Sequence, residues 1–494
     1  MMKSKSVIPL MVLLAVLVGL IFLKDAKQER PNIQERVKTL IPADVSLANV
    51  AKLVISSGVQ PDQPVTLVRD ESDTEAWRVE NHFNAPVNKD KISGYLDALI
   101  GAKGEFRATA ASDEALQQYE LTADKAFAVE AFGAGAEQAT FKLLIGKAPS
   151  YQQVFVRMDG SNDVYVLDKD LRAEAGVYAR GEETPAEAPK ADVWLDKQVL
   201  SFDKTKATRL AFHTSYRDLT LEFAAKQKEA QPATDDEGEG AEGAPEQPEV
   251  TYEWVVAEGG PGAALKPNAV DGLLNFLSTL KATDIVDPAT AAEWGLETPA
   301  FTSTITVDGQ EFVLEGGCPE SAADGYVRVK GKTDVFYKLP ATSFEKAFGK
   351  GSDLFELAKL DAKREDMKRI EVKSPTGNYV LTKKDETWAV ESPKAGKEAN
   401  TAAIDGVVNA VASLKASDYA DSSSDKGLEK PSQSITVTAG DKTHTVAFGN
   451  KAGCVGVYAR FASDGPAVIV NPADISRIYI DPKGFVQSEA APAE

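Results

Sequence analysis

Two stretches of this 494-residue chain share one layout, NAVDGLLNFLSTLKATD at residues 268–284 and NTAAIDGVVNAVASLKASD at residues 400–418. In each, an asparagine precedes apolar residues at offsets 0, 3, 4 and 7, which lie on one face of a helix. A third helix with these offsets carries Ile92, Tyr95, Leu96 and Leu99. The asparagines ahead of the helices, Asn88, Asn268 and Asn400, are expected to cap them. Three such helices predict an internal repeat.

The repeat extends on both sides of each helix. A short strand-like run with a tryptophan lies 15 or 16 residues before the helical stripe, at Trp77, Trp254 and Trp388. After the helix come a turn built on a leucine and then alternating apolar runs that are typical of strands and hairpins. The leucines are Leu121, Leu296 and Leu428. We expect these tryptophan and leucine side chains to form the core where each helix rests on its sheet.

One arginine recurs late in each copy, two residues after an aromatic, at Arg157, Arg328 and Arg460. Two interpretations remain open for this set. Arginines on neighbouring antiparallel strands form cross-strand salt bridges with acids. Alternatively, arginines at equivalent places in three modules form a row that contacts an anion or a partner protein.

The order of these features predicts an α+β fold that follows an N-terminal transmembrane helix. Three repeated modules are expected, each an antiparallel sheet or meander with one main amphipathic helix. The second module carries an insert, residues 225–249, whose acids and prolines without aromatics predict disorder. The expected boundaries are 1–30 for a cytoplasmic tip and the anchor, 47–200, 201–363 and 364–484 for the modules, and 485–494 for a disordered tail.

The N-terminus predicts where the chain resides. Residues Val7 to Leu23 form 17 positions without a charge, and Lys24 follows them. As a helix they would be roughly 25 Å long, close to the thickness of a bilayer core. No small residues stand just before Lys24, whereas cleavage by a signal peptidase needs them. We therefore expect an uncleaved signal anchor that contacts membrane lipid, with a short tail inside and the body outside.

Composition and motifs argue against several functions. With 55 basic and 75 acidic residues the net charge is −20, which argues against a nucleic-acid partner. The histidines, His82, His213 and His444, form no metal-binding pair, and no complete phosphate-binding or nucleophile motif occurs. We therefore expect no catalytic residue, no metal and no cofactor. The two cysteines, Cys318 and Cys454, lie in corresponding loops of different modules, and we expect free thiols, since a bond would require those modules to face each other.

A turn of the form Gly-Leu-x-x-Pro, a strand pair, a glycine loop and an aromatic-Val-Arg strand follow one another between Ala282 and Phe344. This pattern resembles domain-of-unknown-function family 4340 (DUF4340). The resemblance covers most of residues 47–484 and is fainter in the first copy. It implies a protein of the bacterial inner membrane with a periplasmic body, associated with ABC-type transporters and gliding-motility auxiliary proteins. It implies no catalytic residue.

Two classes of function follow from these observations. Repetition without a catalytic constellation favours a non-enzymatic scaffold or accessory subunit of an ABC-type transport system or envelope assembly, with envelope or transporter membrane proteins as partners. The alternative is a protein that binds or hydrolyses envelope glycan or peptide, which rests on the abundance of acids alone. A deep cleft with converging carboxylates would favour the enzyme, and shallow faces would favour the accessory role.

The mass of the intact chain tests the anchor prediction. Protein extracted from membranes with detergent is expected to retain residues 1–23, because the residues before Lys24 do not suit a signal peptidase. N-terminal sequencing gives an independent measurement. A mature chain that starts shortly after Leu23 would show that the segment is a cleaved signal peptide.

Overall fold

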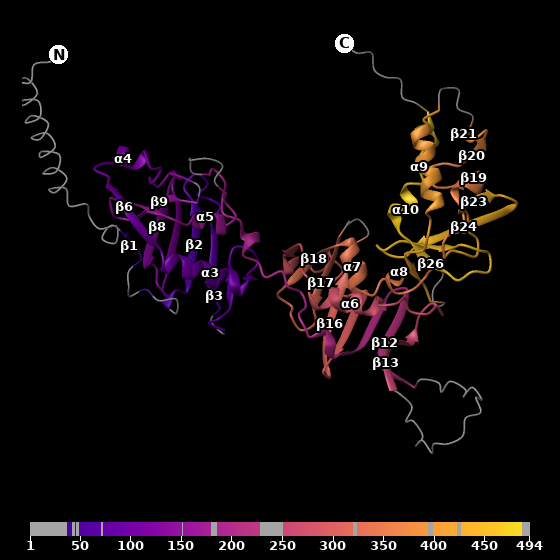
Figure 1. Ribbon diagram of the computed structural model, residues 1–494, viewed down its shortest axis with the longest axis horizontal. Helices are drawn as coiled ribbons and strands as arrows, with labels where there is room; N and C mark the ends of the chain where they lie inside the picture. The colour runs from indigo at the N-terminus through magenta and orange to yellow at the C-terminus, as the bar shows by residue number, and fades with distance from the viewer. Residues whose placement is uncertain are drawn as a thin grey trace, which may run out of the picture. The chain divides into compact units, whose positions relative to one another are not determined.

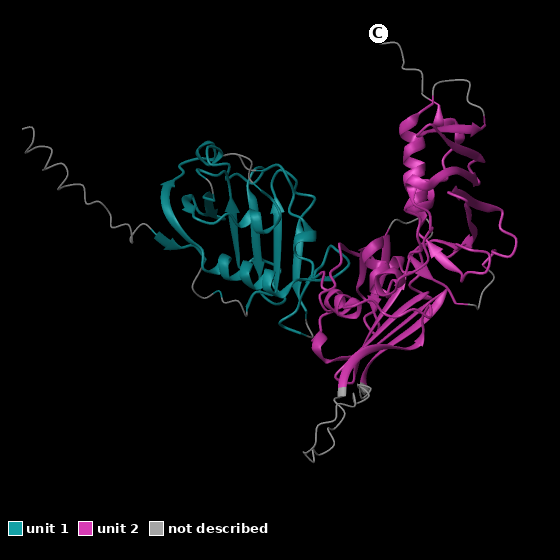
Figure 2. Ribbon diagram, turned by 45° about the vertical axis from the view of Figure 1, so that its right-hand side comes forward, with its two compact units in different colours: residues 1–196 teal, residues 197–494 magenta. Residues whose placement is uncertain are grey.

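The computed structural model describes residues 37–41, 45, 49–70, 73–150, 152–178, 185–227, 250–319, 324–393, 399–421 and 426–486. The chain divides into two compact units, residues 1–196 and 197–494 (Figure 2). The predicted tip and anchor, residues 1–30 with Val7 and Leu23, lie outside the described residues. Within the described ranges, no helix is both long and apolar enough to cross a membrane.

The described residues form three antiparallel sheets, one of ten strands in unit 1 and two of eight strands in unit 2 (Figure 1). In spatial order, sheet 1 contains β1 (Val37–Thr39), β6 (Lys103–Thr109), β10 (Asp163–Leu167), β9 (Val154–Met158), β8 (Phe141–Ile145), β7 (Phe127–Phe132), β2 (Lys52–Ser57), β3 (Val65–Arg69), β4 (Trp77–Val79) and β5 (Ala85–Pro86).

Sheet 2 contains, in spatial order, β13 (Val250–Gly259), β12 (Arg217–Gln227), β11 (Ala207–Thr214), β15 (Phe301–Val307), β16 (Gln310–Gly317), β17 (Asp324–Val329), β18 (Phe336–Pro340) and β14 (Asp284–Val286). Sheet 3 contains β21 (Thr387–Ser392), β20 (Tyr379–Lys384), β19 (Met367–Lys373), β23 (Gln433–Ala439), β24 (Lys442–Lys451), β25 (Val457–Arg460), β26 (Val468–Val470) and β22 (Asp418–Tyr419). Without its end strands, β1 and β5, sheet 1 has the same connectivity as sheets 2 and 3. The predicted repeat and the α+β class are confirmed.

One main helix lies on each sheet, α3 (Lys89–Ile100), α6 (Ala269–Ser278) and α9 (Thr401–Ala412) (Figure 1). The predicted apolar stripes are the residues that these helices bury. Shorter elements are α4 (Asp113–Gln117), α5 (Leu171–Glu174), α7 (Ala341–Ala347), α8 (Gly351–Leu354) and α10 (Pro472–Ser476), with 3₁₀ turns η3 (Ala191–Val193), η4 (Lys204–Lys206), η5 (Pro288–Thr290), η6 (Arg364–Asp366) and η7 (Pro482–Phe485).

Two of the three asparagines cap their helices as expected. The side chain of Asn88 accepts a hydrogen bond from the amide of Lys91 at 3.0 Å, and Asn400 accepts one from Ala403 at 3.2 Å. Asn268 occupies the N-cap position of α6 but makes no capping bond with its side chain. Its backbone is left-handed, with φ of 58°, whereas side-chain capping requires extended backbone.

Two predicted boundaries need correction. Residues 225–227 of the expected acidic insert continue β12, and residues 228–249 lie outside the described residues. The expected disordered tail starts too early, because Phe485 is fully buried against Tyr379, with ring centres 4.9 Å apart. Val486 pairs with Ala399, just before α9. The tail beyond it, residues 487–494, lies outside the described part of the chain.

Cys318 and Cys454 form a disulfide, with their Cα atoms 6.0 Å apart. The expectation of free thiols is therefore wrong. That expectation depended on whether the two modules face each other, and within unit 2 the loops that carry the cysteines meet. A cross-link between residues 136 positions apart restricts the unfolded chain, which typically contributes about 2–4 kcal/mol of stability.

A buried ion pair also joins sheet 2 to sheet 3. Arg217 begins β12 and Asp418 begins β22, and both are almost fully shielded from solvent. Nε of the guanidinium donates to Oδ1 of the carboxylate at 2.8 Å, and Nη2 donates to Oδ2 at 2.9 Å. Nη2 also donates to the carbonyl of Gly349 at 2.7 Å, and the Tyr216 hydroxyl donates to Oδ2 at 3.2 Å. The buried carboxylate is thus paired and hydrogen-bonded, as a buried charge must be.

The surroundings of this pair keep the guanidinium charged. Burial alone would lower the pKa of Arg217, but Asp418 more than offsets it and raises that pKa above its ordinary value. The guanidinium also lies 4.9 Å from the ring centre of Tyr419. Burial raises the pKa of the Tyr419 phenol to about 12, and that of the Tyr216 phenol well above its ordinary value. Both phenols therefore stay neutral at physiological pH.

Replacement of one partner is expected to damage unit 2. Asp418→Ala leaves the Arg217 charge buried without its carboxylate, which should lower the free energy of unfolding by about 3–5 kcal/mol in urea titrations. The matched control is Arg217→Met with Asp418→Leu, which removes both charges and should cost less than Asp418→Ala alone. A single variant as stable as the parent chain would show that the pair is solvated in solution.

Candidate functional site

Each sheet carries its tryptophan strand at or next to one edge. In sheets 2 and 3 this strand, β13 or β21, is outermost, whereas in sheet 1 β5 lies outside β4. Trp77 and Trp388 are buried, and Trp254 is half-buried. The space between the tryptophan strand and the first turn of the helix is the candidate site, because the three copies close it differently.

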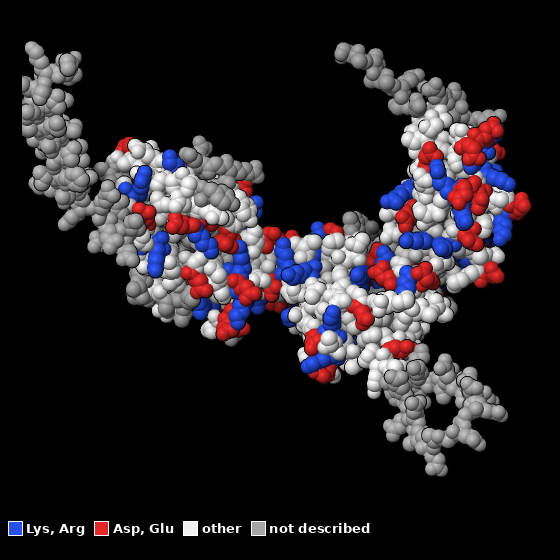
Figure 3. All heavy atoms as spheres, viewed as in Figure 1, with Lys and Arg blue, Asp and Glu red and all other residues white. Residues whose placement is uncertain are grey.

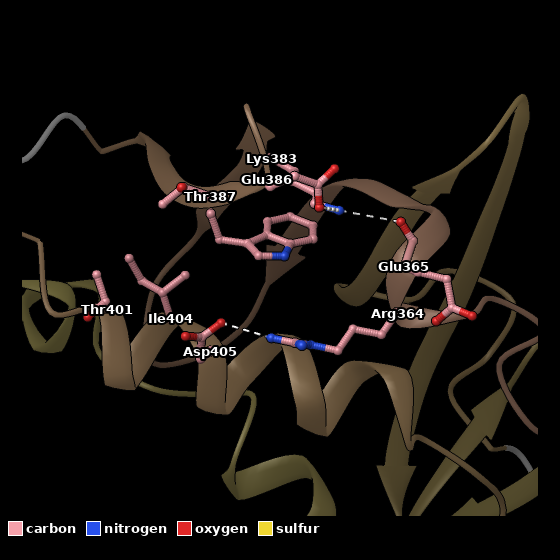
Figure 4. A pocket seen from close by; sticks show the side chains of 9 residues that line it. Arg364, Glu365, Lys383, Glu386, Thr387, Thr401, Ile404 and Asp405 are labelled. Carbon is pink, nitrogen blue, oxygen red and sulfur yellow. Dashed lines mark hydrogen bonds and ion pairs between the residues drawn. The ribbon is translucent and has the colours of Figure 1, made fainter.

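In sheet 3, charged side chains surround this space (Figure 4). A cavity of about 360 Å³ is lined by residues 386–388, by Lys383 of β20, by η6 and by the first turns of α9. Lys383, directly opposite Trp388 on β20, pairs with Glu386 at 2.8 Å. Arg364 pairs with Asp405 of α9 at 2.9 Å. These two pairs give the tryptophan polar surroundings.

Sheet 1 uses the same types of residue. Arg69 is opposite Trp77, and its guanidinium lies 5.1 Å from the centre of the indole ring. Glu75, two residues before Trp77, pairs with Lys89 at the start of α3. Hydrogen bonding to Glu75 raises the pKa of Lys89. In sheets 1 and 3, a cation therefore lies opposite the tryptophan, and an acid two residues before it forms an ion pair.

Sheet 2 has aromatic rings at these two positions. Phe223 is directly opposite Trp254, with ring centres 5.6 Å apart. Tyr252 stands two residues before Trp254, and its ring stacks on Phe223 at 5.8 Å. Phe223 is 44% exposed and Tyr252 is 63% exposed. We call Phe223, Tyr252 and Trp254 the aromatic edge; exposed apolar groups gathered in this way commonly mark an interaction surface.

A groove of about 680 Å³ lies between the aromatic edge and residues 263–271, which lead into α6. Its walls carry somewhat more apolar than polar surface. Besides the three rings they include Val256, Leu265, Pro267 and Val270. Ligand sites are typically concave and lined mainly by apolar and aromatic side chains, with a few polar groups that fix orientation.

The charged groups of the groove are few. Among its described lining residues, Lys266 is basic, and Glu253 and Asp271 are acidic. Lys266 pairs with Glu356 at 3.2 Å and donates to the carbonyl of Ser352 at 2.8 Å. Its charge is thus engaged inside the protein. The groove offers apolar contact beside the carboxylate of Asp271, which suits an apolar ligand with positive charge better than an anion.

The leucines and arginines singled out in the sequence lie elsewhere. Leu121, Leu296 and Leu428 are buried at their turns. Arg157 donates from Nε to the carbonyl of Leu121 at 3.0 Å, whereas Arg328 pairs across the strands with Glu315 at 2.6 Å. Arg460 is half-buried, and its Nε has no hydrogen-bond partner among the residues that the structure describes. The three equivalent arginines thus have three different environments.

Charged residues elsewhere do not compete with the groove as a site. Within the part of the chain that the structure describes, no group of three or more His, Cys, Asp or Glu side chains could hold a metal ion. Acidic and basic side chains are interspersed over the face shown in Figure 3. His213 contacts Asp218 at 2.5 Å in an exposed position on neighbouring strands.

Sequence reasoning missed Phe223 and Tyr252. One signal was available, because alignment of the copies on their tryptophans places Tyr252 level with Glu75 and Glu386. An exposed aromatic where two other copies carry an acid is informative. Phe223 gave no such signal, since the insert separates it from Trp254 in sequence and only the strand register brings the two together.

Exchange of residues between copies tests whether the rings are needed for the fold. The double variant Phe223→Lys with Tyr252→Glu gives sheet 2 the residues of sheet 3. It should change the free energy of unfolding by no more than about 0.5–1 kcal/mol, because both side chains are exposed. Urea titration measures this, and binding of an apolar fluorescent dye should fall. A loss of several kcal/mol would show that the rings belong to the core.

Comparison with known proteins identifies a family. No curated protein matches this chain. The model of a domain of unknown function (DUF4340) matches residues 77–252 and 254–429, which together make up more than half of the chain. The two matches begin at Trp77 and Trp254. The first ends just before Trp254, and the second continues past Trp388 to the turn at Leu428, so each crosses from one sheet to the following one. This confirms the resemblance seen in the sequence, and the chain belongs to the DUF4340 family.

Proposed function

We propose that this protein is a non-enzymatic accessory subunit that binds another envelope protein through the groove of sheet 2. The aromatic edge carries this proposal. Tryptophan and tyrosine contribute much of the binding energy at protein interfaces when they lie at the centre of a contact. Because sheets 1 and 3 have charged residues at the equivalent positions, the fold itself does not require exposed rings there.

The proposed location is the periplasmic side of the bacterial inner membrane, with residues 7–23 as the anchor. Two observations support it. The uncharged N-terminal segment is long enough to approach the thickness of a bilayer core. The disulfide between Cys318 and Cys454 fits an oxidising compartment, where such bonds persist. An anchor would hold the groove within reach of membrane proteins, and we propose the subunits of an ABC-type transport or envelope assembly as its partners.

Recovery of partners from membranes tests the proposal. The full chain, extracted in mild detergent, should co-purify with permease or auxiliary subunits in quantitative mass spectrometry. The variant Phe223→Lys with Tyr252→Glu should recover at least ~10-fold less of these subunits, because the loss of central aromatic contacts commonly costs 2 kcal/mol or more of binding free energy. Lys383→Ala with Glu386→Ala, at the equivalent positions of sheet 3, is the matched control and should leave recovery unchanged.

A different pattern of recovery would contradict the accessory role. If the chain were purified without partner subunits, and the purified body instead bound or cleaved envelope glycan, the alternative function would apply. Aromatic rings also stack on sugars, so glycan binding that is lost in the Phe223→Lys, Tyr252→Glu variant would assign the same groove to a different ligand.

A further inference from the structure

Among the described strands, none pairs with the outer side of β13. β13 is the outermost strand of sheet 2 and is 10 residues long. Its sequence, VTYEWVVAEG, contains no proline and no basic residue. Long edge strands pair with other chains unless charge, proline or short length prevents it.

The equivalent edges of the other sheets have such protection. In sheet 1 the outermost strand, β5, has two residues and ends in Pro86. In sheet 3, β21 has six residues, Pro393 follows it directly, and the Lys383–Glu386 pair lies beside it. Proline and short length thus protect two of the three equivalent edges, whereas β13 has neither and carries only two acids, Glu253 and Glu258, with a bulge near its C-terminal end.

The register shows which backbone groups of β13 face outward. A two-residue turn connects Thr214 to Arg217, so these residues form a hydrogen-bonded pair of the antiparallel ladder. Hydrogen-bonded and non-hydrogen-bonded pairs alternate along the strands. The same alternation continues from β12 to β13. It directs the N–H and C=O groups of Tyr252, Trp254 and Val256 away from β12, on the outer side of β13.

Sheet 3 gives the same result independently. A two-residue turn at residues 385–386 connects Lys384 to Thr387, which therefore form a hydrogen-bonded pair. The alternation then directs the backbone groups of Trp388 and Val390 outward. These two residues are the equivalents of Trp254 and Val256, so the orientation is a property of the repeat.

We propose that β13 binds an extended segment of a partner protein as an added strand. This inference rests on the proposed function and specifies its mode of contact. The outward amides and carbonyls of Tyr252 and Trp254 supply backbone hydrogen bonds, and the groove receives alternate apolar side chains of the incoming strand, as in other cases of strand addition. Asp271 on the groove wall favours a segment with basic residues beside its apolar ones.

Hydrogen exchange on the full chain in detergent tests this mode directly. The probe is a nine-residue peptide that alternates valine with lysine. At saturation it should slow amide exchange at Tyr252 and Trp254 at least tenfold. The matched peptide, N-methylated on alternate residues, keeps the same side chains and charge but lacks one row of backbone donors. It should bind at least tenfold more weakly.

A pair of proline variants supplies a second measurement. Val256→Pro removes an outward amide and leaves the ladder with β12 intact, because proline is tolerated where its missing N–H faces solvent. Affinity for the peptide should fall at least tenfold. Val390→Pro, the same change at the equivalent place in sheet 3, should leave affinity unchanged. If Val256→Pro fails to fold, the N-methylated peptide still decides the question.

Three outcomes would overturn strand addition. The first is equal binding of the N-methylated peptide, and the second is protection from exchange outside β13. The third is a dimer in sedimentation experiments that Val256→Pro dissociates and that excludes the peptide, because β13 would then pair with a second copy of the chain.

Recovery from membranes separates this inference from the proposed function. Partner recovery that is lost with Phe223→Lys, Tyr252→Glu but retained with Val256→Pro would keep the accessory role and overturn strand addition. A chain that is purified from membranes without partner subunits, yet binds the peptide through β13, would overturn the accessory role and leave strand addition at β13 in place.

Discussion

The constraint on which the structure depends is the width of its sheets. Eight strands at a spacing of about 4.8 Å form a face roughly 34 Å wide, whereas a helix with its side chains is only about 10–12 Å wide. α3, α6 or α9 therefore covers only part of one face of its sheet. The tryptophan strand lies at or next to the edge of its sheet, where in sheet 3 α9 still packs against β21, and side chains beside each tryptophan complete its shielding.

The copies diverge in how they meet this requirement. Arg69 and Lys383 lie opposite the tryptophans of sheets 1 and 3, and an acid beside each tryptophan forms an ion pair. Sheet 2 uses Phe223 and Tyr252, which shield Trp254 but stay exposed themselves. A side chain of this kind gains about 1.5–3 kcal/mol when it is fully buried. The aromatic edge forgoes part of that stabilisation in the free protein, and a bound partner can supply it.

The contact between sheets 2 and 3 fixes the position of β12, the strand that carries Phe223 of the aromatic edge. β12 begins with Arg217, which is held by Asp418 of sheet 3, and six residues later it carries Phe223. A buried ion pair adds little net stability compared with apolar packing, but it tolerates few alternative arrangements, because a misplaced charge would be left unpaired. Together with the disulfide, it ties sheet 3 to the sheet that carries the groove.

The sequence by itself determined the helical stripes and the tryptophan strands, because these depend on periodicities that are local to each segment. It did not reveal the Cys318–Cys454 bond, the ion pair between residues 201 positions apart, or the register that sets Phe223 beside Trp254. Only the tertiary structure decided these, because contacts between distant segments leave no periodic signal in either one. The groove is made of such contacts, which is why it could not be read from the sequence.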